Sequence, residues 1–313
     1  MIFQFREGVT WRDKGQMNKI LVAGAGGRLG VAVLDELRRR GYRARALVRD
    51  EARTGRGARR AGSVFVGDAR RPEALRGACD GVDVIISSMG ASLRLGQTPD
   101  GATFRDVDFR ANLNLLEEAR RARVRKFIYV SVYGAESLRG LEYVDAHEEF
   151  VEALKRSGVG YAVVRPTGLF YIFGEVFRMA QRGRAVVVGD GGARTNPVHE
   201  EDVARECVDA VECGGCEVSV GGPETYTRRE IAELAFQALG KRPKITSVPA
   251  PAMRAALQPL RLFDRRLYDF FDFGLAVSTR DLVAPAAGRT SLRRHFRQLA
   301  GVSSGEFQLR IQN

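Results

Sequence analysis

The stretch Lys19–Gly30, which reads KILVAGAGGRLG, decides the fold. It opens with the continuous apolar run Ile20–Ala23, which is typical of a strand buried on both faces of a parallel sheet. Glycines follow at positions 24, 26, 27 and 30. Residues 31–40 then place apolar and charged side chains with the period of a helix. The glycine cluster is therefore predicted to form a turn between a buried strand and a helix.

A glycine-rich turn in this position is typical of dinucleotide-binding folds. The small residues let a pyrophosphate approach the backbone, and the start of the helix attracts its negative charge. We therefore expect the turn to bind a cofactor through its glycines and through the two residues that separate Gly27 from Gly30. These residues are Gly24, Gly26, Gly27, Arg28, Leu29 and Gly30.

The end of the second predicted strand, Arg43–Val48, bears on which cofactor is bound. In dinucleotide folds an acidic residue at this place binds the ribose of NAD, whereas a basic residue accommodates the 2′-phosphate of NADP. Arg49 comes first and Asp50 second, so the sequence favours NADP(H) over NAD(H), with Arg28 as a candidate second guanidinium. If Asp50 faced the ribose instead, NAD would be favoured. Two solvated turn charges are the remaining interpretation.

The rest of the chain repeats the alternation of strand and helix. Strands are predicted at 63–66, 82–87, 126–132 and 161–165, and helices at 104–124 and 142–156. This order predicts an α/β fold with a doubly wound parallel sheet. Ligands of such sheets bind beyond the carboxyl ends of the strands. The cofactor is therefore expected to contact Asp68, Ala69, Ser87, Ser88 and Met89, with Asp68 accepting from the adenine amino group.

Composition narrows the class of protein. The net charge is +12 and the pI is about 10.0, but the arginines are scattered over many predicted helices, so a specific nucleic-acid partner is not favoured. No apolar run reaches the length of a membrane span, and the first residues lack the apolar core of a signal peptide. We expect a cytoplasmic protein in which residues 1–16 form a flexible extension before a natural start at Met17.

Cys213 and Cys216 form a CxxC pair in a glycine-rich turn. Such a pair can be a redox couple, half of a metal site or part of a structural loop. A second CxxC is lacking and the three histidines are scattered, so the sequence favours a structural loop and predicts no metal site.

Several segments in a fixed order resemble the atypical, or extended, short-chain dehydrogenase/reductase family, close to its NmrA-like and NAD(P)H-binding members. They are VAGAGGRLG (22–30), ALVRD (46–50), residues 67–88 and 107–135, VVRPTGLF (163–170), NPVHEEDVA (196–204) and residues 220–235. The resemblance implies a Rossmann domain over residues 17–170. It also implies a smaller α+β substrate-side region over residues 171–313, interleaved with the Rossmann core.

The resemblance implies hydride transfer to or from nicotinamide. In the family a tyrosine acts as acid and base, a lysine four residues later lowers its pKa, and a serine polarises the substrate carbonyl. Ser131 and Tyr143 match these positions, whereas His147 replaces the lysine. Residues four apart share a helix face, so Tyr143 and His147 can adjoin, but an imidazole lowers the pKa of a phenol less than an ammonium does. Pro166 and Thr167 are expected beside the nicotinamide.

Two functions follow from the resemblance. The first is an NAD(P)H-dependent oxidoreductase that acts on a small or medium carbonyl, quinone or ene compound. The alternative is a non-catalytic NADP(H)-binding redox sensor or accessory subunit, which His147 favours.

Residues 254–273 mix aromatic side chains with arginines. This composition predicts a peripheral membrane or protein contact, a substrate lid, or a helix packed on the domain. The oligomeric state, the substrate and the direction of hydride transfer stay open.

Overall fold

The computed structural model describes residues 19–49, 60–91 and 101–301. The predicted N-terminal extension and Asp50 therefore lie outside the described residues. A seven-stranded parallel sheet forms the centre, in the order β3-β2-β1-β4-β5-β6-β9. The strands are β1 (Lys19–Ala23), β2 (Arg43–Val48), β3 (Ser63–Val66), β4 (Val84–Ser87), β5 (Lys126–Val130), β6 (Gly160–Pro166) and β9 (Cys216–Val220).

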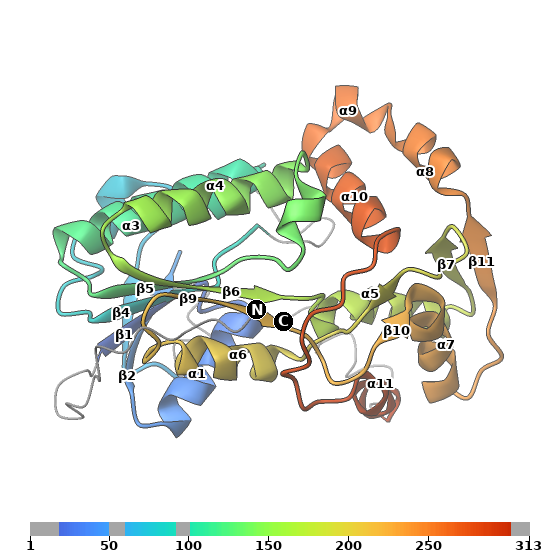
Figure 1. Ribbon diagram of the computed structural model, residues 1–313, viewed down its shortest axis with the longest axis horizontal. Coiled ribbons are helices and arrows are strands. Elements are labelled where there is room, and N and C mark those ends of the chain that lie inside the picture. The colour runs from blue at the N-terminus through green and yellow to red at the C-terminus, as the bar shows by residue number, and fades with distance from the viewer. Residues whose placement is uncertain (1–18, 50–59, 92–100, 302–313) are drawn as a thin grey trace, which may run out of the picture.

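Helices cover both faces of this sheet (Figure 1). One face packs on α1 (Arg28–Arg39) and α6 (Glu200–Asp209), and the other on α3 (Asn112–Arg121) and α4 (Glu142–Arg156). The central strands β1, β4 and β5 are buried because each presents apolar side chains to both helical layers, as the unbroken apolar runs predicted, whereas the edge strand β3 is mostly exposed. The doubly wound Rossmann fold is confirmed. The strand order reverses at β1, whose neighbours are β2 and β4, so the turn after β1 lies at the switch point where such sheets bind ligands.

The segment before α3 departs from the single helix expected at 104–124. Residues Arg105–Ala111 form a π-helix, η3, which runs directly into α3. Asn112 stands at the junction, and its side-chain amide donates to the carbonyls of Val107 (3.2 Å) and Asp108 (3.0 Å). This wider turn places Asp108 in the interior, where its side chain is fully buried. Such π-helical turns are frequent at functional sites.

The C-terminal region builds a second, smaller core. Its helices α5 (Phe170–Gln181), α7 (Arg228–Ala238) and α11 (Leu292–Ala300) share one apolar cluster. Beside them β7 (Ala185–Val188) pairs with β11 (Ile245–Val248), and β8 (Arg194–Thr195) pairs with β10 (Tyr226–Thr227). Between these pieces, α6 and β9 return to the main sheet. The region is therefore interleaved with the Rossmann core. Two of its elements, α6 and β9, lie after the predicted boundary at 170/171 but belong to the Rossmann core.

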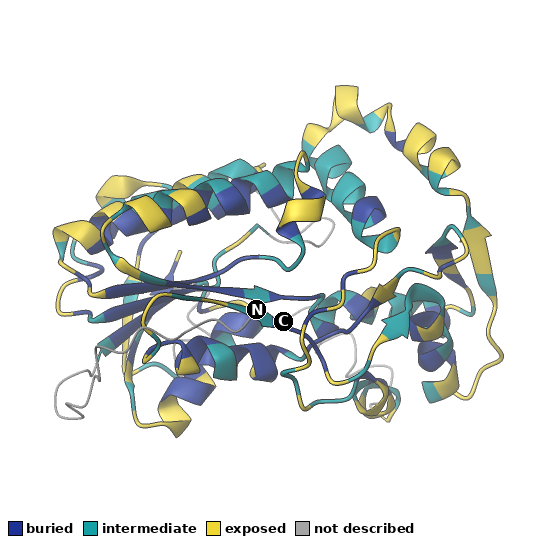
Figure 2. Cartoon of the chain, viewed as in Figure 1, coloured by how far each residue is buried: buried dark blue, intermediate teal, exposed yellow. Residues whose placement is uncertain are grey.

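Three helices form an arm at the edge of the molecule: α8 (Ala250–Leu257), α9 (Leu260–Phe263) and α10 (Arg265–Ser278). Figure 2 shows that α8 and α9 are largely exposed, whereas α10 turns one face inward. Phe273 of α10 packs on the ring of Tyr143, with ring centroids 4.4 Å apart. The arm therefore combines a packed helix with an exposed tip.

A disulfide joins Cys213 and Cys216 in the turn before β9. Within the described ranges, no cluster of histidine, cysteine and carboxylate side chains could hold a metal ion. None of the described helices is both long and apolar enough to cross a bilayer.

Candidate active site

A large cleft opens at the carboxyl ends of the sheet strands and extends under the C-terminal region. Its volume is about 2250 Å³, well above the few hundred to a thousand that a small-molecule pocket occupies. Both parts of the chain line it, from the glycine turn after β1 to the inner face of α10. It therefore has room for an extended cofactor and a substrate beside it.

The glycine turn forms a cradle that a side chain would fill. Gly24 has φ +77°, and a Cβ added there would come within 2.8 Å of the backbone of Ser88. A Cβ on Gly30 would come within 2.1 Å of the Gly24 carbonyl oxygen, so α1 packs tightly on the turn. The first turn of α1 carries no acidic side chain. This geometry fits a pyrophosphate bound at the start of the helix.

The predicted cofactor residues lie together, with one exception. The residues that line the cleft are Gly24, Gly26, Gly27, Arg28, Leu29, Gly30, Arg49, Asp68, Ala69, Ser88, Met89, Pro166 and Thr167. Ser87 has a different place. It is fully buried, and its hydroxyl donates to Asn112 Oδ1 at 2.6 Å. The cofactor contact expected of Ser87 therefore needs correction, because its side chain braces the helix behind the cleft.

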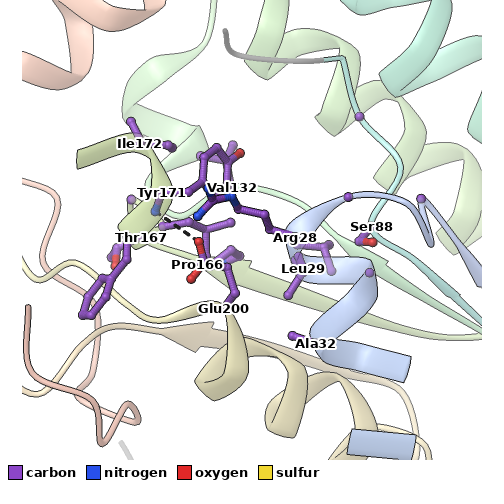
Figure 3. A pocket seen from close by; sticks show the side chains of 18 of the residues that line it. Arg28, Leu29, Ala32, Ser88, Val132, Pro166, Thr167, Tyr171, Ile172 and Glu200 are labelled. Carbon is purple, nitrogen blue, oxygen red and sulfur yellow. Dashed lines mark hydrogen bonds between the residues drawn. The ribbon is translucent and has the colours of Figure 1, made fainter. Parts of the chain in front are cut away.

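Arg49 and Asp68 mark one end of the cleft, which we call the adenosine end. The Asp68 carboxylate accepts hydrogen bonds from the side chain and the backbone N–H of Arg70, and these bonds lower its pKa. The adenine contact predicted for Asp68 would compete with Arg70. Arg28 does not point to this end. Figure 3 shows its side chain extending across the cleft toward Val132 and Tyr171, so it is not the second guanidinium beside Arg49.

Tyr143 lies at the opposite end of the cleft, which we call the reaction end. Its ring is packed between Phe104 (centroids 5.2 Å apart), His147 (4.6 Å) and Phe273 (4.4 Å). Burial, and then the negative charge of Asp108, raise the pKa of Tyr143 well above its ordinary value. Within the described part of the chain, no basic group acts to lower it. The phenol is therefore a neutral hydrogen-bond donor.

His147 is only 4% exposed, and both of its ring nitrogens face other groups. Nδ1 lies 2.6 Å from the hydroxyl of Tyr129, and Nε2 lies 3.1 Å from Oδ1 of Asp108. Asp108 and Tyr129 are neighbours of His147 that the sequence did not reveal. Asp108 stands four residues before Asn112, but only the π-helix turns it inward. His147 shares a face with Tyr143 as predicted, yet its nitrogens are engaged away from the phenol.

Ser131 lines the cleft, but its hydroxyl is also engaged. It donates to Glu148 Oε1 at 2.9 Å and accepts from Arg165 Nη1 at 3.2 Å. The Glu148 carboxylate in turn binds Arg165. The predicted role of Ser131 in polarising a carbonyl would require its proton to leave Glu148.

Two further histidines border the cleft near Arg28. His199 caps the start of α6, where its Nδ1 accepts from the N–H of Glu201. Burial, His199 and Arg28 lower the pKa of His295 to about 4, so its ring is neutral. Both fit the packing and hydrogen-bonding role predicted for His199.

Comparison with known proteins agrees with this geometry. The photosystem II assembly factor Ycf39 of Trieres chinensis is 22% identical over 265 residues, which cover 83% of this chain and 79% of that protein. The divinyl chlorophyllide a 8-vinyl-reductase of Zea mays is 29% identical over 265 residues, which cover 76% of this chain. The match spans 63% of the reductase, so the maize enzyme is considerably longer than the shared part.

Among solved structures, the NADPH-dependent quinone oxidoreductase of Escherichia coli in complex with NADPH superposes with a TM-score of 0.72. It is 23% identical and covers 90% of this chain and 99% of its own. This likeness supports the fold. The model of the NAD(P)H-binding family matches residues 24–213, more than half of the chain. The chain therefore belongs to the NAD(P)H-binding family, as its resemblance to NmrA-like, atypical short-chain dehydrogenases/reductases predicted.

Proposed function

We propose that the protein is an NADPH-dependent reductase that passes a hydride to a flat, conjugated acceptor such as a quinone or an ene compound. One observation carries the proposal. Tyr143 faces the reaction end as a neutral phenol, while His147, at the position of the usual lysine, is engaged by Asp108 and Tyr129. The site therefore holds a proton donor, but it lacks the lysine that in the family makes this donor a base.

The cleft fits the cofactor. Bound NADPH would supply the hydride, with its pyrophosphate at the cradle of Gly24 and Gly30. Arg49 at the adenosine end is suited to the 2′-phosphate, since a guanidinium pairs strongly with phosphate oxygens. Pro166 and Thr167 border the reaction end, where the family holds the nicotinamide.

The state of Tyr143 favours reduction of a particular class of acceptor. Oxidation of an alcohol needs a base to take its proton, and a phenol of raised pKa is a poor one. Reduction of a simple ketone builds up a localised negative charge on oxygen, which an acid must stabilise as it forms, and a phenol of raised pKa does this less well. A quinone or conjugated ene spreads the charge left by the hydride, so a neutral phenol or water can supply the single proton that completes the product. The maize vinyl-reductase and the Escherichia coli quinone oxidoreductase are named for acceptors of this class.

An acceptor panel tests the proposal. Oxidation of NADPH is followed with quinones, conjugated enes, aliphatic ketones and aldehydes, and the reverse reaction is followed with NADP⁺ and alcohols. We expect turnover with quinones or enes and none with alcohols. Tyr143→Phe should lower the rate by at most about a hundredfold, the lower end of general acid catalysis. Preferred turnover of aliphatic carbonyls and alcohols would contradict the proposal.

A specific observation favours a second candidate function, an NADPH-binding accessory protein that works at an anionic membrane surface. Leu262 and Phe263, at the tip of the arm, are 85% and 87% exposed, and the same arm carries the exposed Arg254, Arg261 and Arg265. Exposed apolar side chains on a segment rich in arginine fit an anionic lipid surface. Tight NADPH binding without turnover of any acceptor would favour this function. The cytoplasmic location expected from the sequence stays a prediction for both candidate functions.

A further inference from the structure

Arg228 lies in the cleft at a position that the proposed reaction does not use. It is the first residue of α7, directly after a capping box in which Thr227 and Glu230 bind each other's backbone N–H groups. Its own N–H donates to the carbonyl of Ala193 at 3.0 Å. The start of the helix is thus fixed on both sides, and the side chain of Arg228 leaves a rigid point toward the cleft.

The guanidinium of Arg228 is charged but incompletely paired. Nη2 donates to the carbonyl of Val277 at 2.5 Å, whereas Nε is buried without a hydrogen-bond partner. Burial lowers the pKa of Arg228 to about 10, so the charge persists at neutral pH. Asp281, whose negative charge acts on Arg228, binds the backbone and side chain of Arg194 instead. Among the described residues, no carboxylate forms an ion pair with Arg228.

The surroundings of this cation are apolar and close to the reaction end. Phe273, Val277 and Leu282 line the same part of the cleft. Val277, whose carbonyl holds Arg228, lies one helical turn after Phe273, a rise of about 6 Å. Phe273 in turn packs on Tyr143. A molecule lying against these apolar side chains would reach Tyr143 at one end and Arg228 at the other.

We propose that Arg228 binds a carboxylate carried by the acceptor, so that the substrate is a flat apolar body with an acidic side chain. A partly buried guanidinium without a carboxylate partner is stabilised by an anion that brings oxygen acceptors to the N–H groups that face the cleft. One arginine in apolar surroundings matches a singly charged carboxylate. A doubly charged phosphate would meet too little positive charge here. The inference rests on the proposed function for the identity of the acceptor, and on Arg228 for the negative charge that the acceptor carries.

Paired acceptors test this proposal. A naphthoquinone that carries a short carboxylic side chain is compared with its methyl ester, using kcat/KM at saturating NADPH. In the wild-type protein we expect the acid to be preferred roughly 10- to 100-fold, as for a hydrogen bond to a charged group. Arg228→Met should abolish this ratio, and Arg228→Lys should restore part of it.

Arg229 supplies the matched control. It follows Arg228 in α7, but its side chain binds the carbonyl of Asp190 and the hydroxyl of Ser247 and does not line the cleft. Arg229→Met should keep the preference for the acid. The melting temperature and NADPH affinity of each variant check that the fold and the cofactor site are intact.

Binding of the acid and the ester to the NADP⁺-loaded protein, measured by calorimetry, separates this proposal from the proposed function. Tighter binding of the acid that depends on Arg228, in a protein without turnover, would support the carboxylate site and overturn the reductase. Turnover with equal kcat/KM for acid and ester, or an acid preference that survives Arg228→Met, would overturn the carboxylate site and leave the reductase standing. Equal binding of the acid and the ester to the NADP⁺-loaded protein would also overturn the carboxylate site.

Discussion

Asp108 shows how a single buried carboxylate shapes the reaction end. Its Oδ2 accepts from the N–H of Ala91 at 3.1 Å, and its Oδ1 faces Nε2 of His147. The same charge helps to raise the pKa of Tyr143. In place of a lysine that would favour the phenolate, the chain has an aspartate that disfavours it. His147 in place of the family's lysine and the charge of Asp108 therefore act in the same direction, since both disfavour ionisation of Tyr143.

Asp108→Ala is expected to destabilise the protein. The substitution leaves the N–H of Ala91 without its acceptor and removes the carboxylate that faces His147 in a buried place, which costs roughly 1–3 kcal/mol. Urea unfolding measures the change in the free energy of unfolding. Glu117→Ala is the control, because Glu117 of α3 is exposed and pairs with the exposed Arg120. Equal losses for both variants would show that Asp108 has no special structural role.

Arg49→Ala tests the cofactor preference. Loss of a guanidinium beside the 2′-phosphate should weaken NADPH binding roughly 10- to 100-fold and leave NADH binding nearly unchanged. Fluorescence titration with both cofactors gives the two affinities. Arg38→Ala serves as the control, since Arg38 of α1 is exposed and lies outside the cleft. An unchanged preference for NADPH in Arg49→Ala would exclude Arg49 as its origin.

At the scale of elements, the sequence predicted what depends on local pattern. The apolar runs predicted the strands, and the glycine spacing predicted the turn after β1. The spacing of Thr227 and Glu230 is typical of the capping box that starts α7. The π-helix η3 could not be predicted from local pattern, because the side chain of Asn112 donates hydrogen bonds to backbone carbonyls of the preceding turn. The partners of His147 and Arg228 come from distant segments, so periodicity along the chain did not reveal them.

The arm formed by α8, α9 and α10 carries its own prediction. Leu262 and Phe263 at its tip are almost fully exposed, so their replacement by serine should leave the melting temperature unchanged. If the tip enters an anionic membrane surface, the double variant should lose flotation with vesicles that contain phosphatidylserine. Vesicles of phosphatidylcholine alone are the control. Wild-type protein that fails to float with anionic vesicles would contradict this contact.

For the whole molecule, the cleft joins two parts with different tasks. The Rossmann sheet supplies the cradle and the adenosine end, whereas the interleaved C-terminal region supplies Arg228 and α10. Tyr143 lies where the two meet, with its ring against Phe273. In the proposed function, cofactor and substrate are held by separate cores, and only the glycine turn of the first core has a sequence pattern that predicts a ligand.

The pH dependence of kcat/KM for a quinone with NADPH tests the central claim most directly. The pKa of Tyr143 is raised above its ordinary value of about 10, so the phenol stays protonated from about pH 6 to about pH 9. We therefore predict turnover without an inflection from Tyr143 in this range. An inflection near neutral pH that disappears in Tyr143→Phe would show an activated tyrosine and contradict the account.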